Sequence, residues 1–135
     1  MKKIALVVSD FNEKITSKME KNAEKTARSL KAIITKKIHV PGAFEIPFAV
    51  QILMKNKNVD AVVVLGAVIQ GDTDHDVVIV SAVSKKLLDI SLDSNKPLGF
   101  GIIGPRVTRQ QAEKRALGYS ERAVKAALEM DKIKK

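Results

Sequence analysis

Apolar residues follow two patterns along the chain, and together these patterns predict alternating strands and helices. Unbroken apolar runs rich in β-branched residues are typical of strands buried on both faces. Such runs occupy residues 4–9 and 61–65, and residues 36–40 and 97–103 are predicted as the second and fourth strands. Elsewhere apolar residues recur every three or four positions, as on one face of an amphipathic helix. These stretches predict helices over residues 14–30, from Pro47 to about residue 55, over 77–91, and from Thr108, a candidate N-cap, to about residue 132.

The order of these elements, a strand followed by a helix four times over, predicts the fold class. Strands that are separated by helices and read as unbroken apolar runs indicate a parallel sheet covered by helices on both faces. Right-handed crossovers then leave few topologies. We therefore expect a single α/β domain over residues 1–135, a three-layer α/β/α sandwich. Its four-stranded parallel sheet should be flavodoxin-like and doubly wound.

The aromatic residues are concentrated where the predicted strands end. In open parallel sheets, ligands bind outside the carboxyl ends of the strands. The chain has four Phe, one Tyr and no Trp, and Phe11, Phe44 and Phe100 all stand at such exits. These three rings either stack on a flat ligand or cap the core, and placement alone favours neither interpretation. The fourth, Phe48, falls inside a predicted helix and is expected in the core.

His75, in the segment after the third strand, is the best candidate for acid–base chemistry, because a histidine exchanges protons near neutral pH. Asp72, Asp74 and Asp76 flank it, so a metal site is conceivable. This contiguous run has no established metal-ligand spacing, however, and we predict no metal. The other histidine, His39, lies within a strand and is expected to be structural.

Phosphate binding is a second theme of the same segment. Gly71, Asp72 and Thr73 precede a helix, whose free N–H groups attract anions. The segment is neither a Walker loop nor a GxGxxG motif, so nucleotide binding by a standard motif is not predicted. Arg115, in the last helix, has the planar fork that suits a phosphate. By itself it is one of many surface arginines.

The formal net charge of +9 comes from 24 Lys and Arg against 15 Asp and Glu. Most of the excess lies on predicted helix surfaces near the two ends, which is typical of solvated faces, although a phosphate-bearing ligand or nucleic acid would also suit it. Few aromatics and no recognised motif argue against nucleic acid, and no apolar run is long enough for a membrane span. The absence of cysteine excludes disulfide and thiolate chemistry. It is compatible with the cytoplasmic location that we expect.

Four segments and one arginine together resemble the lumazine synthase family of riboflavin biosynthesis. They are SDFN at 9–12, VPGAFEIP at 40–47, GAVIQGDTDH at 66–75, PLGFG at 97–101, and Arg115. The likeness covers nearly the whole chain in the same order, and the second and third segments are specific in combination.

The resemblance implies the penultimate step of riboflavin biosynthesis. In this step 5-amino-6-(D-ribitylamino)uracil condenses with 3,4-dihydroxy-2-butanone 4-phosphate, giving 6,7-dimethyl-8-ribityllumazine, phosphate and water without a cofactor. Two alternatives stay open. One is the archaeal type of riboflavin synthase, which dismutates two lumazines on a similar fold. The other is a non-catalytic flavin or lumazine binder or shell. His75 and the complete PGAFEIP segment favour the condensing enzyme.

The resemblance also implies roles for individual residues. Those implied to bind the pyrimidine and its ribityl chain are Phe11, Asn12, Gly42, Ala43, Phe44, Glu45, Val68, Ile69 and Phe100. Those implied to hold the phosphate are Asp72, Thr73 and Arg115, and His75 is implied to move protons. Phe100 is expected to reach the site of a neighbouring subunit. The family thus implies a homo-oligomer, either a pentamer or an icosahedral shell of pentamers.

Overall fold

Strands and helices alternate along residues 1–134, the part of the chain that this computed structural model describes. The elements are β1 (Lys3–Ser9), α1 (Glu13–Ser29), β2 (Ile33–Val40), a 3₁₀ turn η1 (Ala43–Glu45), α2 (Ile46–Leu53), β3 (Ala61–Ala67), α3 (His75–Ser94), β4 (Leu98–Ile103) and α4 (Arg109–Ile133). The predicted order of strands and helices is confirmed. Within residues 1–134, no helix combines the length and apolar character that a membrane crossing requires.

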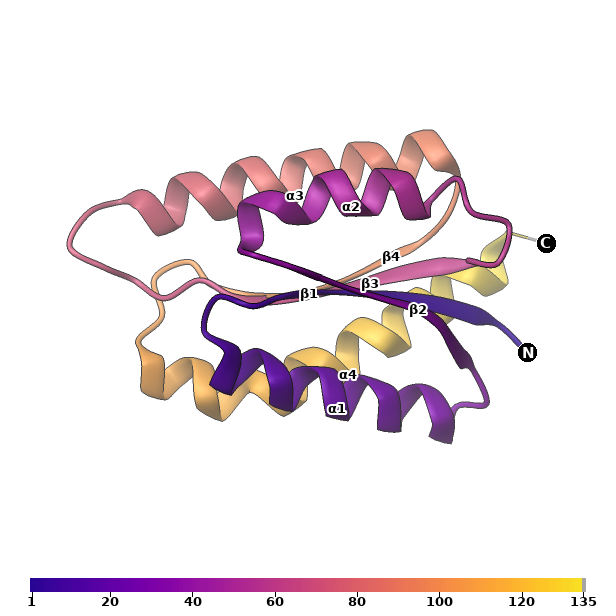
Figure 1. Ribbon diagram of the computed structural model, residues 1–135, viewed down its shortest axis with the longest axis horizontal. Helices are drawn as coiled ribbons and strands as arrows, with labels where there is room; N and C mark the ends of the chain where they lie inside the picture. Colours follow the sequence, from indigo (N-terminus) through magenta and orange to yellow (C-terminus); the bar gives the residue numbers. More distant parts are fainter. Residues whose placement is uncertain (135) are drawn as a thin grey trace.

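The four strands in these residues form one parallel sheet in the order β2-β1-β3-β4. Helices α1 and α4 cover one face, and α2 and α3 cover the other (Figure 1). The predicted doubly wound α/β/α sandwich is thus confirmed. β2 and β3 lie on opposite sides of β1 in the sheet. The chain runs from β1 outward to β2 and later crosses back over β1 to β3. Between β1 and β3 the connections therefore diverge, which opens the crevice where such sheets bind ligands.

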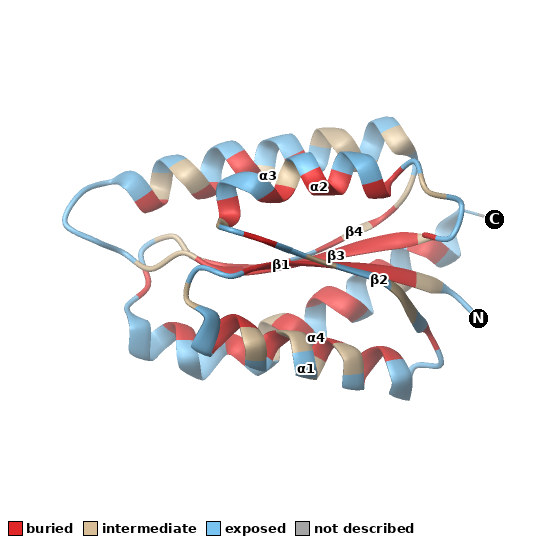
Figure 2. Cartoon of the chain, viewed as in Figure 1, coloured by how far each residue is buried: buried red, intermediate tan, exposed pale blue. Residues whose placement is uncertain are grey.

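Two cores, one on each side of the sheet, hold the layers together. Alternate side chains of β3 enter different cores, so that Val63 packs toward α1 and α4 while Val62 and Val64 pack toward α2 and α3. Every residue of β3 is buried, whereas the edge strand β2 is largely exposed (Figure 2). β2 begins at Ile33 and not at residue 36 as predicted, because Ile33 and Ile34 already pair with β1. The polar pair Lys36 and Lys37 interrupts the apolar residues of this strand, which a strand with one solvated side tolerates.

Phe48 does not belong to the core, and that prediction is wrong. The residue lies in α2 as expected, but its side chain is 68% exposed. The face of α2 that packs on the sheet consists of Ile46, Ala49, Val50 and Leu53. These residues have the spacing of a single helix face, and Phe48 falls on the opposite side.

The starts of α3 and α4 set the positions of His75 and Arg109, the ionisable residues with which the two helices begin. Helix α3 begins at His75, two residues before the predicted start, and its buried Asp76 accepts a hydrogen bond from the backbone N–H of Arg106 at 2.8 Å. Thr108 caps α4 as predicted. Its hydroxyl accepts from the N–H of Gln111 at 3.1 Å, and the Gln111 side chain accepts from the N–H of Thr108 at 3.0 Å. This reciprocal cap fixes Arg109 as the first residue of α4.

Candidate active site

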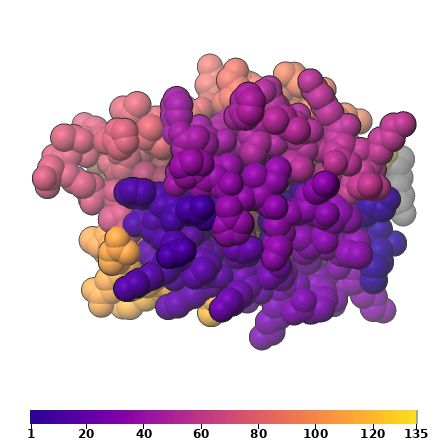
Figure 3. Space-filling view, in the orientation of Figure 1, coloured from indigo at the N-terminus to yellow at the C-terminus, as the bar shows by residue number. Residues whose placement is uncertain are grey.

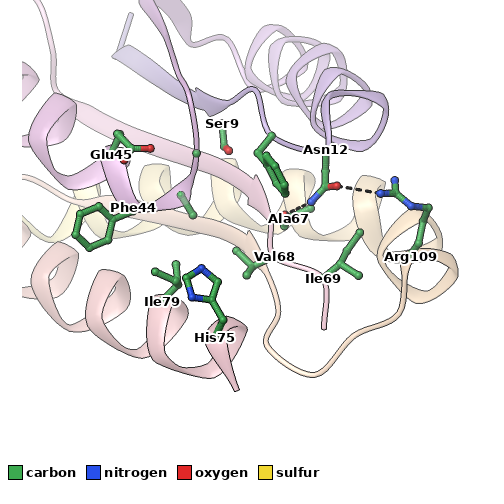
Figure 4. A pocket seen from close by; sticks show the side chains of 13 residues that line it. Ser9, Asn12, Phe44, Glu45, Ala67, Val68, Ile69, His75, Ile79 and Arg109 are labelled. Atoms are coloured by element: carbon green, nitrogen blue, oxygen red, sulfur yellow. Dashed lines mark hydrogen bonds between the residues drawn. The ribbon is translucent and has the colours of Figure 1, made fainter. Parts of the chain in front are cut away.

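A pocket of about 410 Å³ opens where β1, β2 and β3 end, at the divergence of the connections (Figure 4). Its volume lies within the range of small-molecule sites. Three ionisable side chains line it, those of Glu45, His75 and Arg109. The whole lining comprises Ser9, Phe11, Asn12, Gly42, Ala43, Phe44, Glu45, Ala67, Val68, Ile69, His75, Ile79 and Arg109.

Nine of the residues predicted for the site line this pocket, although they come from three separate segments of the sequence. They are Phe11, Asn12, Gly42, Ala43, Phe44, Glu45, Val68, Ile69 and His75. The carboxyl ends of neighbouring parallel strands meet at one edge of the sheet, which brings these segments together. Sequence reasoning missed Ser9, Ala67, Ile79 and Arg109.

The four remaining predicted residues lie outside the lining. Asp72 and Thr73 are exposed just before α3, where the Thr73 hydroxyl accepts from the backbone N–H of His75 at 3.3 Å. Phe100 lies on β4 beside a separate shallow hollow that it shares with Tyr119 and Arg122 of α4. Arg115 is exposed on α4, four residues before Tyr119.

The rings of Phe11 and Phe44 line the pocket without capping the core. They are 70% and 65% exposed in this chain, so the core gains little from either. Large exposed apolar side chains gathered around a cavity are a feature of binding surfaces. For these two residues the core-capping alternative is therefore wrong.

A short chain of hydrogen bonds holds Asn12 in place at the mouth of the pocket. Its amide nitrogen Nδ2 donates to the backbone carbonyl of Ala67 at 2.7 Å, and its oxygen Oδ1 accepts from Nη2 of Arg109 at 3.1 Å (Figure 4). Asn12 itself adopts the left-handed conformation, with φ of 64° and ψ of 46°. Asparagine tolerates this region better than most residues.

On the other side of the same segment, His39 joins β2 to β1 and α1. Its Nδ1 lies 2.6 Å from Oδ1 of Asp10, and its Nε2 lies 3.1 Å from Oε1 of Glu20. The hydrogen bond with Asp10 is the main cause that raises the pKa of His39 above its usual 6.5. Glu20 adds to this increase, and burial of the ring opposes it. These contacts agree with the structural role expected for His39.

The contribution of His39 to stability should depend on pH. Because the folded-state pKa is raised, this contribution is fully present below about pH 6.5 and is lost as the pH rises through the folded-state pKa. The ring of His39 and the carboxylate of Asp10 are about half exposed, so we expect at most about 1 kcal/mol. In urea unfolding, His39→Gln should lose more stability relative to wild type near pH 5.5 than near pH 8.5. An equal loss at both pH values would contradict this role.

The fold and the pocket define a doubly wound α/β protein with a small-molecule site that combines aromatic rings with a carboxylate, an imidazole and a guanidinium. Residues 1–135 match the 6,7-dimethyl-8-ribityllumazine synthase family, and the chain belongs to that family. It is a transferase that forms 6,7-dimethyl-8-ribityllumazine in riboflavin biosynthesis.

Relatives of the same name support this assignment over nearly the full chain. The 6,7-dimethyl-8-ribityllumazine synthase of Methanococcus maripaludis is 44% identical over 132 residues, covering 98% of this chain and 96% of its own. The proteins of the same name from Staphylothermus marinus and Methanothermobacter thermautotrophicus are 48% identical over 130 residues and 47% identical over 132 residues. Both alignments cover 96% of this chain, and they cover 87% and 94% of those two relatives. The resemblance inferred from the sequence segments is therefore confirmed.

Proposed function

We propose that the pocket where β1, β2 and β3 end is where the two substrates of the family reaction condense. The observation that carries this proposal is the convergence of Phe11, Phe44, Glu45 and His75 on a single cavity. An aromatic face suits the flat ring of 5-amino-6-(D-ribitylamino)uracil, which we assign to Phe11. The Glu45 carboxylate suits the hydroxyls of the ribityl chain, because a carboxylate accepts several hydrogen bonds. The backbone near Ala43, Val68 and Ile69 supplies polar groups for the uracil edge.

His75 is the proposed proton carrier of the reaction. Its imidazole lines the pocket together with Val68 and Ile79 (Figure 4). Imine formation and loss of phosphate both require proton transfers, which a neutral-range base and acid accelerates. Holding the two substrates side by side adds a gain in effective concentration.

We propose that the phosphate of 3,4-dihydroxy-2-butanone 4-phosphate binds beside the start of α3. The segment with Asp72 and Thr73 leads into this helix, and backbone N–H groups at a helix start attract anions. Arg115 supplies the matching positive charge from α4, as the family resemblance implies. In a single chain Arg115 lies outside the pocket, so we assign it to the pocket of a neighbouring subunit.

Two observations support this shared site. Arg115, Tyr119 and Arg122 have the spacing of one helix face, and the latter two border the hollow that contains Phe100. Large apolar side chains are also exposed on α2 and α3, among them Phe48, Ile52, Leu88 and Leu92. Burial in an assembly would remove this surface from water. We therefore propose a homo-oligomer, a pentamer or a shell of pentamers.

Because both substrates are polar molecules that do not cross membranes unaided, we also propose a cytoplasmic location.

A hybrid assembly tests the shared site directly. We expect Arg115→Ala to raise the KM for the phosphate substrate more than the KM for the pyrimidine, and His75→Ala to slow turnover. The two variant chains can be unfolded and reassembled together into hybrids. These hybrids should be more active than either variant alone, because at some interfaces an intact His75 of one chain then meets an intact Arg115 of its neighbour. Native mass measurement should give several subunits per particle. A monomeric enzyme, or hybrids no more active than the two variants alone, would overturn the assignment.

The proposed reaction at this pocket is tested by mixing the purified protein with the two substrates and following lumazine absorbance and fluorescence. Product should form above the uncatalysed rate, and Phe11→Ala should weaken the use of the pyrimidine. Supplying lumazine alone should give no riboflavin, which separates the condensing enzyme from the dismutating one. Tight pigment binding without turnover would instead indicate the non-catalytic binder.

A further inference from the structure

Arg109 lines the pocket, yet no sequence motif selects it, and its position breaks a local rule. It is the first residue of α4, and the first turn of that helix contains no acidic residue. A helix N-terminus carries partial positive charge, so a cation there is disfavoured by about 0.3–1 kcal/mol. Residues that break local preferences without local compensation tend to serve a site.

The contact made by Arg109 joins distant parts of the chain. Its guanidinium donates to Asn12, 97 residues away in the sequence, and Asn12 donates to the carbonyl of Ala67, 55 residues from itself. The start of α4 is thereby linked to the β1–α1 segment and to the end of β3. In Figure 3 the indigo surface of the β1–α1 segment lies close to the orange surface at the start of α4.

These two hydrogen bonds fix the orientation of the Asn12 amide. The amide oxygen faces the guanidinium and the amide nitrogen faces the carbonyl of Ala67. A flipped amide would set N–H groups against the guanidinium and an oxygen against the carbonyl, which leaves both pairs unsatisfied. Arg109 therefore selects one of the two amide orientations.

Asn12 in turn determines where Phe11 lies. Asn12, with its left-handed backbone, directly follows Phe11 and is the N-cap residue of α1. The backbone N–H of Phe11 donates to the carbonyl of Pro41 at 3.0 Å, while its side chain is mostly exposed. Few packing contacts hold the ring itself, so its position depends on the anchors of the flanking backbone.

We propose that Arg109 is a positioning residue for the pyrimidine: its guanidinium fixes the Asn12 amide and, through it, the turn that presents Phe11 to the substrate. This inference rests on the proposed binding of the pyrimidine at Phe11. Direct contact between Arg109 and the phosphate substrate is the competing role, and kinetics separates the two.

The test is a double-mutant cycle with Arg109→Met, which removes every donor but keeps an unbranched chain, and Asn12→Ala. We expect each single variant to raise the KM for the pyrimidine by about 3- to 10-fold, the value of one such hydrogen bond. The KM for the phosphate substrate should change less than about twofold. The double variant should be no worse than Asn12→Ala alone, because Arg109 acts through Asn12. Arg109→Lys, which keeps a donor, should recover part of the loss.

Arg28→Met is the matched control, since it makes the same change at an exposed arginine in the last turn of α1 and should leave both KM values unchanged. Multiplicative losses in the double variant, or a loss confined to the phosphate substrate, would overturn the positioning role. Phe11→Ala separates this result from the proposed function. If Phe11→Ala raises the KM for the pyrimidine and Arg109→Met does not, only the role of Arg109 fails. If neither does, the pyrimidine site is also wrong.

Discussion

Replacing His75 with alanine is expected to lower kcat by about 10²-fold while the KM for each substrate changes by less than about threefold. A positioned acid–base group typically contributes about 10²–10⁴-fold. We expect the low end, because the pocket still holds both substrates together and keeps the gain in effective concentration. His75 is exposed at the first position of α3, so its loss should leave the core intact. Steady-state kinetics on lumazine formation measures the effect.

His39→Gln is the control, because it changes the chain's other histidine, which lies outside the pocket lining. It should keep kcat within about twofold. A loss confined to KM would make His75 a binding group. An unchanged kcat would mean that water or the substrate itself moves the proton.

The sequence predicts the interior of this fold better than its edges. β3 is buried along its whole length, so its residues can only be apolar and its pattern is plain. β2 has one partner strand and is mostly exposed or half-buried, and the polar residues Lys36 and Lys37 separate its first residues from the apolar end of the strand, so the pattern does not predict where it begins. α3 begins at His75, where polar residues that face solvent or the pocket hide the helical period.

The candidate site was predictable where it depends on strand exits and not where it depends on long-range contacts. Phe11, Phe44 and His75 are found together because parallel strands end at one edge. Arg109 meets Asn12 only through the packing of α4 beside α1, so no spacing in the sequence predicts that contact. Phe48 was misjudged because an apolar residue on a helix is expected to be buried, whereas Phe48 lies on the outer face of α2.

The largest effect on stability is expected at Gly99, where β4 packs against α4. A Cβ atom at this position would lie 2.1 Å from the backbone oxygen of Ala123 and 2.8 Å from its carbonyl carbon. Backbone atoms inside a helix cannot move aside as a flexible side chain does, so β4 and α4 would have to separate. We expect Gly99→Ala to lower the free energy of unfolding by about 3 kcal/mol or more, at or beyond the upper end for an overpacked core. The smaller entropy of the unfolded alanine chain offsets only about 0.4–1 kcal/mol.

Gly66→Ala is the matched control, because Gly66 also lies in a buried strand but has room for a methyl group. Its added Cβ would meet its nearest neighbour, the Cβ of Ser9, at 3.5 Å, an ordinary van der Waals distance. Urea unfolding should show a loss for Gly66→Ala that stays below about 1 kcal/mol. Because Phe100 directly follows Gly99, the separation of β4 from α4 should also displace that ring and weaken the proposed subunit assembly. Equal losses of stability in the two variants would mean that the contact between Gly99 and Ala123 relaxes at little cost. The close packing of β4 on α4 would then not explain why glycine occupies position 99.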